Sequence, residues 1–347
     1  MPVTPRPSPY AGVLPALVVG LAMLAVLSIR LGAVPIGFSD MASAIRKAGS
    51  APETLDLTER IFLEIRLPRA LACMLVGASL AIGGVLLQAL FRNPIVEPGL
   101  VGTSSGAAFG AALYFVLGSA IGFHAGPWTL PIAACLGGAL ATALVFWFSG
   151  QANARRDSVT GVLLVGIAVN ALFLSGVGFL SYIARDPQAR SITFWSLGTL
   201  SGANWPAVGL LAVSTSAGLI FALRQARHLN ALMLGETEAF GLGVDVKRLK
   251  VTVIAIDVLL VAVATSLTGI IGFVGLIVPH LLRLLRGSDN RYLMLGSAVM
   301  GAMVLTLADI AARTLLRPAE LPIGILTSAI GAPVFVALLR SRRERFE

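Results

Sequence analysis

Residues 68–91 have the sequence PRALACMLVGASLAIGGVLLQALF. Only Arg69 in this stretch is charged, and the hydrophobic residues do not alternate with polar ones as they do in a barrel strand. A helix rises about 1.5 Å per residue, so about 20 apolar residues cross the hydrocarbon core of a bilayer. Because lipid offers the backbone no hydrogen-bond partner, a crossing segment of this kind is helical. The stretch predicts a transmembrane helix.

Similar apolar stretches recur along the 347-residue chain, in which 56% of the residues are hydrophobic and 12% are charged. The charged share is about half that of a soluble domain. We therefore predict an all-α membrane protein, a polytopic bundle of about ten transmembrane helices that forms a single domain over residues 1–347. The expected spans are 11–32, 68–91, 100–119, 128–149, 159–184, 205–225, 250–271, 273–286, 292–315 and 321–340.

Lysine and arginine predict how this bundle is oriented. Ten crossings place both termini on one side of the membrane, and that side receives 16 of the 26 basic residues. Basic residues gather in cytoplasmic loops, so we expect both termini in the cytoplasm and the chain in the inner (cytoplasmic) membrane. The same topology explains the net charge of +9 without a nucleic-acid partner. The first span lacks a small-residue cleavage site, which predicts a retained helix and not a signal peptide.

Two hydrophilic stretches interrupt the apolar pattern. The outer one, at about 33–67, is long enough to hold a short amphipathic helix. The inner one, at about 226–248, mixes leucine and methionine with charged residues and glycine. That mixture fits a helix-turn-helix lying against a soluble partner, and it fits an ordinary solvated loop equally well.

The sequence contains no arrangement of residues that predicts catalysis or metal binding. His124, His228 and His280 fall at different places in the expected topology, so they form no metal site. Cys73 and Cys135 lie inside apolar runs, where a free cysteine is most often a small buried hydrophobe. The chain also lacks the P-loop pattern GxxxxGK[ST]. We therefore expect no catalytic residue, no metal ligand and no ATPase site in this chain.

Ion coupling is the other common source of energy for transport. Asp257 is the only carboxylate well inside an expected span, whereas a proton or sodium relay needs several partnered groups. Asp309 stands four residues before Arg313, and an i,i+4 ion pair explains its presence. An external motor is therefore favoured over a stand-alone secondary transporter or channel, and a membrane-embedded enzyme has only the composition in its favour.

Five segments in register resemble the FecCD-type permeases, the membrane subunits of ATP-binding-cassette (ABC) importers for iron-siderophores, haem and cobalamin. They are RLPR at 66–69, GASLAIGGVLLQALFRNPIVEPGLVG at 77–102, GIIGFVGLIVPHLLR at 269–283, LADIAAR at 307–313 and ELPIGILTSAIGAPVFVALL at 320–339. The resemblance implies that two copies form one translocation path, with two cytoplasmic ATPase subunits and one periplasmic substrate-binding protein. ATP and Mg²⁺ then belong to the ATPase, and this chain binds no cofactor. The overall sequence is most similar to haem permeases, with ferric siderophore or cobalamin as the alternative cargo.

The resemblance also implies roles for individual residues. Arg66, Arg69 and Arg313 match the outer arginines that receive glutamates of the binding protein, since a guanidinium group offers a fork of donors to a carboxylate. Anchoring at lipid headgroups, or for Arg313 the pairing with Asp309, is the alternative. The ATPase would dock on a coupling segment containing Leu234, Gly235 and Glu236. The cytoplasmic gate would be formed by Asn93, Ile95, Val159 and Thr160.

Overall fold

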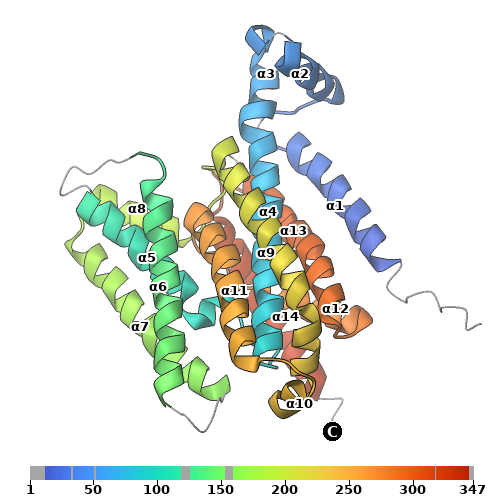
Figure 1. The fold of residues 1–347 in the computed structure, drawn as a ribbon. Coiled ribbons are helices and arrows are strands. Elements are labelled where there is room, and N and C mark those ends of the chain that lie inside the picture. The colour runs from blue at the N-terminus through green and yellow to red at the C-terminus, as the bar shows by residue number, and fades with distance from the viewer. Residues whose placement is uncertain are drawn as a thin grey trace, which may run out of the picture.

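The computed structural model describes residues 12–32, 34–50, 52–118, 126–152, 159–316 and 318–343, and their regular elements are all helices (Figure 1). The elements are α1 (Val13–Arg30), α2 (Phe38–Ser50), η1 (Pro52–Thr54), α3 (Leu57–Arg60), η2 (Ile61–Arg66), α4 (Leu67–Leu90), η3 (Pro98–Val101), α5 (Thr103–Leu113), η4 (Tyr114–Gly118), α6 (Thr129–Ala152), α7 (Val159–Ile183), α8 (Asp186–Ser196), α9 (Trp205–Leu232), α10 (Glu236–Gly241), α11 (Val246–Thr268), α12 (Val274–Arg286), α13 (Asn290–Thr314) and α14 (Ile323–Arg343).

Ten apolar helical segments confirm the expected polytopic bundle. Within the described residues, seven helices are long and apolar enough to cross a membrane, and three shorter apolar helices account for the remaining expected spans. The shorter ones are Thr103–Gly118, Val274–Leu285 and Ile323–Ala337.

Figure 1 shows α2, α3 and α8 at one end of the bundle and α10 at the other. We call these the α2 end and the α10 end; the sequence predicts that they are the outer and cytoplasmic ends.

Helix α4 forms the centre of the bundle, with α9, α11, α12 and α13 packed around it (Figure 1). Glycines allow the backbones to approach closely at two of these contacts. A Cβ atom on Gly77 would lie 2.3 Å from the carbonyl oxygen of Gly301 in α13, and one on Gly84 would lie 1.8 Å from that of Gly275 in α12. Helix α4, which the apolar stretch at 68–91 predicts, is therefore the candidate span most enclosed by its neighbours among the described residues.

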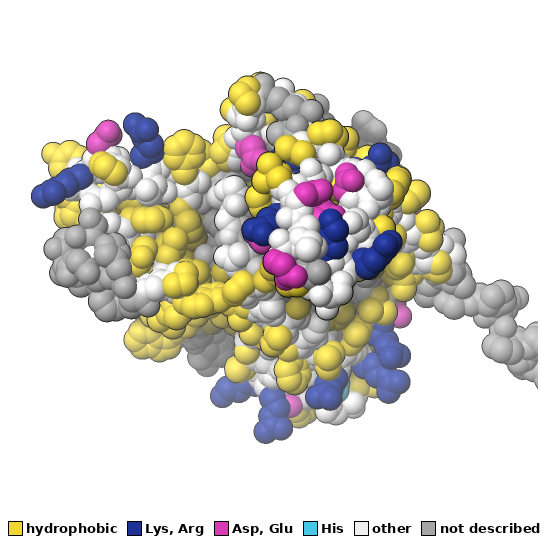
Figure 2. All heavy atoms as spheres, turned by 90° about the horizontal axis from the view of Figure 1, so that it is seen from above, with side chains coloured by type: hydrophobic (Ala, Val, Ile, Leu, Met, Phe, Trp, Pro, Cys, Tyr) yellow, Lys and Arg dark blue, Asp and Glu magenta, His cyan; other side chains and the backbone are white. Residues whose placement is uncertain are grey.

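The predicted amphipathic helix in the outer stretch is α2, which packs with α3 into a cap above α4. Ala44 of α2 is buried together with Phe62 and Ala70. Lys47 of α2 pairs with Glu59 of α3 at 2.8 Å, which joins the two helices. Figure 2 views the molecule from above and shows acidic and basic side chains close together on its nearest part.

The inner hydrophilic stretch differs from its predicted bounds. Helix α9 continues to Leu232, well beyond the span end expected at 225, and only then do a turn and the short helix α10 follow. The continuation remains helical because Ala226, Leu229 and Leu232 keep an apolar face buried at helical spacing. The stretch is therefore a helix-turn-helix formed by the end of α9 and by α10, and its contact with a soluble partner stays a prediction.

Candidate functional site

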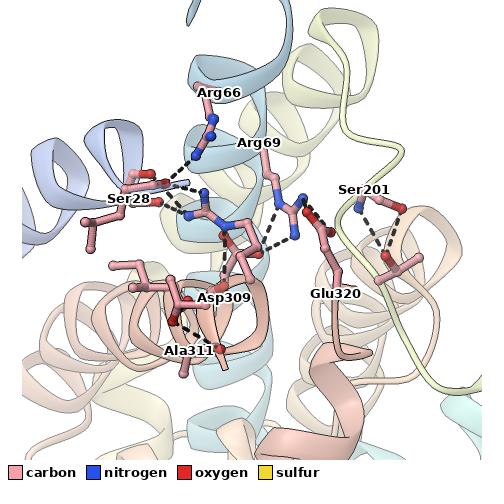
Figure 3. Close-up of polar contacts among 12 residues, drawn as sticks. Ser28, Arg66, Arg69, Ser201, Asp309, Ala311 and Glu320 are labelled. Atoms are coloured by element: carbon pink, nitrogen blue, oxygen red, sulfur yellow. Dashed lines mark hydrogen bonds and ion pairs between the residues drawn. The ribbon is translucent and has the colours of Figure 1, made fainter. Parts of the chain in front are cut away.

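Arg69 is held by two carboxylates at the α2 end (Figure 3). Its Nη2 lies 2.9 Å from Oδ1 of Asp309 in α13, and its Nη1 lies 2.9 Å from Oε2 of Glu320, just before α14. The Arg69 side chain is 12% exposed and that of Asp309 is 1% exposed, whereas Glu320 is 45% exposed. Arg69 therefore joins α4 to α13 in the interior and to a solvent-facing carboxylate at the edge.

Arg313 and Arg66 attach the end of α1 to the same cluster. Arg313 pairs with Asp309 at 2.9 Å and donates hydrogen bonds to the hydroxyl of Ser28 at 2.9 Å and to the carbonyl oxygen of Leu31 at 3.0 Å. Arg66 also donates to the Leu31 carbonyl oxygen. The structure thus brings the three sequence-predicted arginines together and gives each of them an acceptor within the chain. Figure 3 shows Arg66 and Arg69 beside Asp309 and Ser28.

The charges of this cluster do not balance. Three guanidinium groups against two carboxylates leave one positive charge. Asp309 is enclosed between two arginines, whereas Glu320 is partly exposed to solvent. The sequence predicted the arginines and the Asp309–Arg313 pair, but it did not reveal Glu320 or Ser28. Glu320 begins the ELPIG motif quoted above, and only the fold places it against Arg69.

The predicted coupling segment exposes large apolar side chains at the α10 end. Leu234, in the turn before α10, is 69% exposed, and Phe240, within α10, is 76% exposed. Gly235 has φ +142°, where a Cβ atom would lie 1.8 Å from an oxygen of Glu238. Glu236 pairs with Lys250 of α11 at 3.1 Å, which holds α10 against the next helix. Large apolar side chains exposed outside the expected spans are of the kind that a protein–protein interface would cover.

The predicted gate residues have different surroundings. Asn93 and Ile95 lie in the turn after α4, where the Asn93 side-chain oxygen accepts the Ile95 amide at 3.0 Å and Ile95 is 43% exposed. Val159 and Thr160 open α7, but their side chains lie outside the described residues. The structure therefore describes only the first half of the predicted gate.

Two polar residues that the sequence analysis did not single out hold the chain between α4 and α5. Glu97 accepts the backbone amide of Phe273 at 2.7 Å, at the start of α12. Asn170 of α7 donates to the carbonyl oxygens of Gly99 at 3.2 Å and Leu100 at 3.3 Å. This chain segment is consequently tied to two helices, so a movement of either one acts on the turn that contains Asn93 and Ile95.

Asp257 is the remaining ionisable side chain of interest. It is fully buried in α11 beside Gly83, and neither of its oxygens has a hydrogen-bond partner among the described residues. The same part of the chain contains no group of three or more His, Cys, Asp or Glu side chains suited to a metal ion. Asp257 thus lacks the partnered groups of an ion relay.

Comparison with known proteins identifies the family of this bundle. The family model described as "FecCD transport family" matches residues 20–341, nearly the whole chain. The chain belongs to the FecCD transport family. A FecCD permease is the transmembrane subunit of an ABC importer and has no ATPase domain, so this chain is a permease subunit and not an enzyme.

Individual relatives agree with this assignment. The chain is 38% identical over 340 residues to the hemin transport system permease protein HmuU of Yersinia pestis, which covers 95% of both chains. It is 39% identical over 290 residues to the vitamin B12 import system permease protein BtuC of Pectobacterium atrosepticum, covering 83% of this chain and 85% of the relative. A solved structure described as "an inward-facing conformation of a putative metal-chelate type ABC transporter" superimposes with a TM-score of 0.83 at 35% identity, covering 96% of this FecCD chain and all of the other.

Proposed function

We propose that two copies of this chain form the translocation path for haem or a closely related iron chelate across the inner membrane. A separate ATPase drives the path from the cytoplasm, and a periplasmic binding protein supplies the cargo. The similarity to the hemin permease carries the proposal, because it extends over 95% of both chains. The cobalamin permeases match with similar identity over 80 to 83% of this chain.

Cobalamin is the second candidate because identities of 38% and 39% do not separate the two cargoes. Proteoliposomes containing the chain with its ATPase and binding protein should be tested with haemin, a ferric siderophore and cobalamin in parallel. We expect ATP-dependent uptake of haemin to exceed that of the others by about tenfold or more, since a mismatched polar pocket discriminates at least that strongly. Faster uptake of cobalamin would overturn the haem assignment and leave the importer assignment intact.

The α10 end supports the proposed ATPase contact. Leu234 and Phe240 present apolar side chains beyond the apolar spans, and Gly235 and Glu236 fix the turn between them. In this proposal ATP binding draws the ATPase subunits together, and α10 carries the movement into α9 and α11. The path then alternates between two packings of similar energy. The basic residues near this end support its cytoplasmic location, with both termini on the same side.

Replacing Leu234 and Phe240 together by aspartate is expected to release the ATPase. Loss of one buried apolar anchor costs about 2 kcal/mol, equivalent to about thirtyfold in affinity, and the introduced charges add to that loss. The measurement is the amount of ATPase that co-purifies with the permease from membranes. Ile45→Asp is the matched control, because Ile45 is 64% exposed on α2 at the other end of the bundle. Equal loss of ATPase in both variants would contradict the assignment.

The arginine cluster supports the proposed contact with the binding protein. Arg66, Arg69 and Arg313 lie together at the α2 end, and the excess positive charge favours acidic side chains of a partner. Glu320 occupies the exposed donor of Arg69 and would be displaced on docking.

The cytoplasmic end of the path is closed in this proposal by Asn93, Ile95, Val159 and Thr160. A constriction of small polar and apolar groups of this kind can block a bulky solute.

The ion-coupled alternative makes a different prediction about Asp257. If the chain were a secondary transporter, a buried carboxylate in a span would carry the coupling ion. We expect Asp257→Asn to leave ATP-driven uptake within about twofold of the wild type, because no partnered relay surrounds Asp257. Uptake that persists without ATP in the wild type and disappears in Asp257→Asn would favour ion coupling instead.

A further inference from the structure

Asn230 connects the last turn of α9 to the turn between α12 and α13. Its side-chain oxygen accepts the backbone amide of Asn290 at 2.9 Å and the side-chain amide of Asn290 at 2.8 Å. Its own Nδ2 donates to Oδ1 of Asp289 at 3.0 Å. We call these three residues the asparagine clasp. A carboxamide suits all three bonds, because it combines an acceptor of two bonds with a donor.

The clasp lies directly before the coupling segment. Helix α9 ends at Leu232, two residues after Asn230, and the exposed Leu234 follows at once. On the other side, Asn290 is 1% exposed, and Asp289 is the N-cap of α13, accepting the Arg291 amide at 3.0 Å. The hydrogen bonds of Asn230 to the buried Asn290 and to Asp289 therefore connect the coupling segment to the first turn of α13.

Helix α13 reaches from the clasp to the arginine cluster. It runs without interruption from Asn290 to Thr314, about 37 Å at 1.5 Å per residue, and ends with Asp309 and Arg313 in the cluster. Gly301 and Gly77 bring its backbone against α4 halfway along. Rigid secondary elements are among the carriers of coupling between distant sites, and α13 is a continuous helix that links Asn290 to Asp309.

We propose that Asn230 is a positioning residue that couples the ATPase-docking segment to the arginine cluster through α13. The inference rests on the proposed function, since it takes the coupling segment and the cluster as docking sites for the two partners. With the clasp intact, docking of the ATPase alters the arginine cluster, and docking of the binding protein at the cluster alters the ATPase. A merely structural bond would stabilise the bundle without linking the two partners.

The test changes the charges of Asn230 and Asp289 in the full complex of permease, ATPase and binding protein, reconstituted in lipid nanodiscs. Asn230→Asp places a carboxylate beside the carboxylate of Asp289 and opens the clasp. Asp289→Asn alone keeps an oxygen acceptor for Asn230, and asparagine is an equally good N-cap. In N230D/D289N a carboxylate again faces an amide. The readout is the stimulation of ATP hydrolysis by haemin-loaded binding protein, compared with basal hydrolysis and with the amount of bound ATPase.

In Asn230→Asp we expect stimulation to fall to the level without binding protein, while basal hydrolysis and bound ATPase stay within about twofold of the wild type, because the exposed side chains of Leu234 and Phe240 are unchanged. Asp289→Asn should remain stimulated, and N230D/D289N should regain at least half of the stimulation. Full stimulation in Asn230→Asp overturns the inference. So does joint loss of stimulation and basal activity that N230D/D289N does not repair. Failure of the docking sites themselves is distinguishable, because ATPase would then remain bound when Leu234 and Phe240 are changed to aspartate.

Discussion

Asp309→Asn is expected to lower the free energy of unfolding by about 3 kcal/mol, because removing one partner of a buried ion pair leaves uncompensated charge. Asp309 is 1% exposed and pairs with both Arg69 and Arg313, whose side chains are 12% and 6% exposed. With a neutral amide in its place, the buried guanidinium group of Arg313 loses the carboxylate that pairs with it, and Arg69 keeps only the partly exposed Glu320. Thermal unfolding of the purified permease in detergent measures the effect.

Glu320→Gln is the matched control for Asp309→Asn. Glu320 binds the same Arg69 at the same 2.9 Å, but it is 45% exposed, and an exposed ion pair contributes at most about 1 kcal/mol. We expect its melting temperature to remain near that of the wild type. Similar losses in the two variants would mean that burial does not set the strength of this cluster. The comparison separates the buried half of the cluster, around Asp309, from the exposed half, at Glu320.

Much of the fold follows from the sequence because the bilayer imposes a simple requirement. The apolar stretch at 68–91 predicts α4 closely, since both hydropathy and helix length depend on the same hydrocarbon thickness. The end of α9 was predicted too early for a related reason. Hydropathy falls at Arg224 where the lipid-like composition ends, but the helix continues as long as residues such as Leu229 bury one face.

The candidate site was predictable only in part, because its geometry depends on contacts between distant segments. Motif resemblance located Arg66, Arg69 and Arg313, and spacing located the Asp309–Arg313 pair. Glu320 lies 251 residues from Arg69 along the chain, and a local sequence pattern does not predict a contact between such distant residues. Asn230 and Glu97 were missed because single polar residues at helix ends are ordinary in sequence. Their roles appear only when the fold places Asn290 and Phe273 beside them.

Close approach of helices is the other feature that the sequence leaves open, since it contains 37 glycines and does not reveal which of them lie against the backbone of another helix. Gly84 is one that does. A Cβ atom there would lie 1.8 Å from the carbonyl oxygen of Gly275, and Gln88 one turn later donates to that same oxygen at 3.1 Å. Backbone atoms of α12 meet the new methyl group, so no side-chain rotation relieves the overlap.

Gly84→Ala is therefore expected to destabilise the permease by about 3 kcal/mol through overpacking, more than the roughly 1 kcal/mol gained from helix propensity. It should also lower transport, because α12 moves away from Gln88 and from the adjoining segment held by Glu97. Gly178→Ala in α7 is the matched control: no other atom lies within 4 Å of its Cβ position, so the same substitution should be neutral or slightly stabilising. Melting temperature and ATP-driven uptake of both variants provide the measurement. If Gly84→Ala instead behaves like Gly178→Ala, α4 and α12 are not in backbone contact, and the central packing of the bundle differs from the one described.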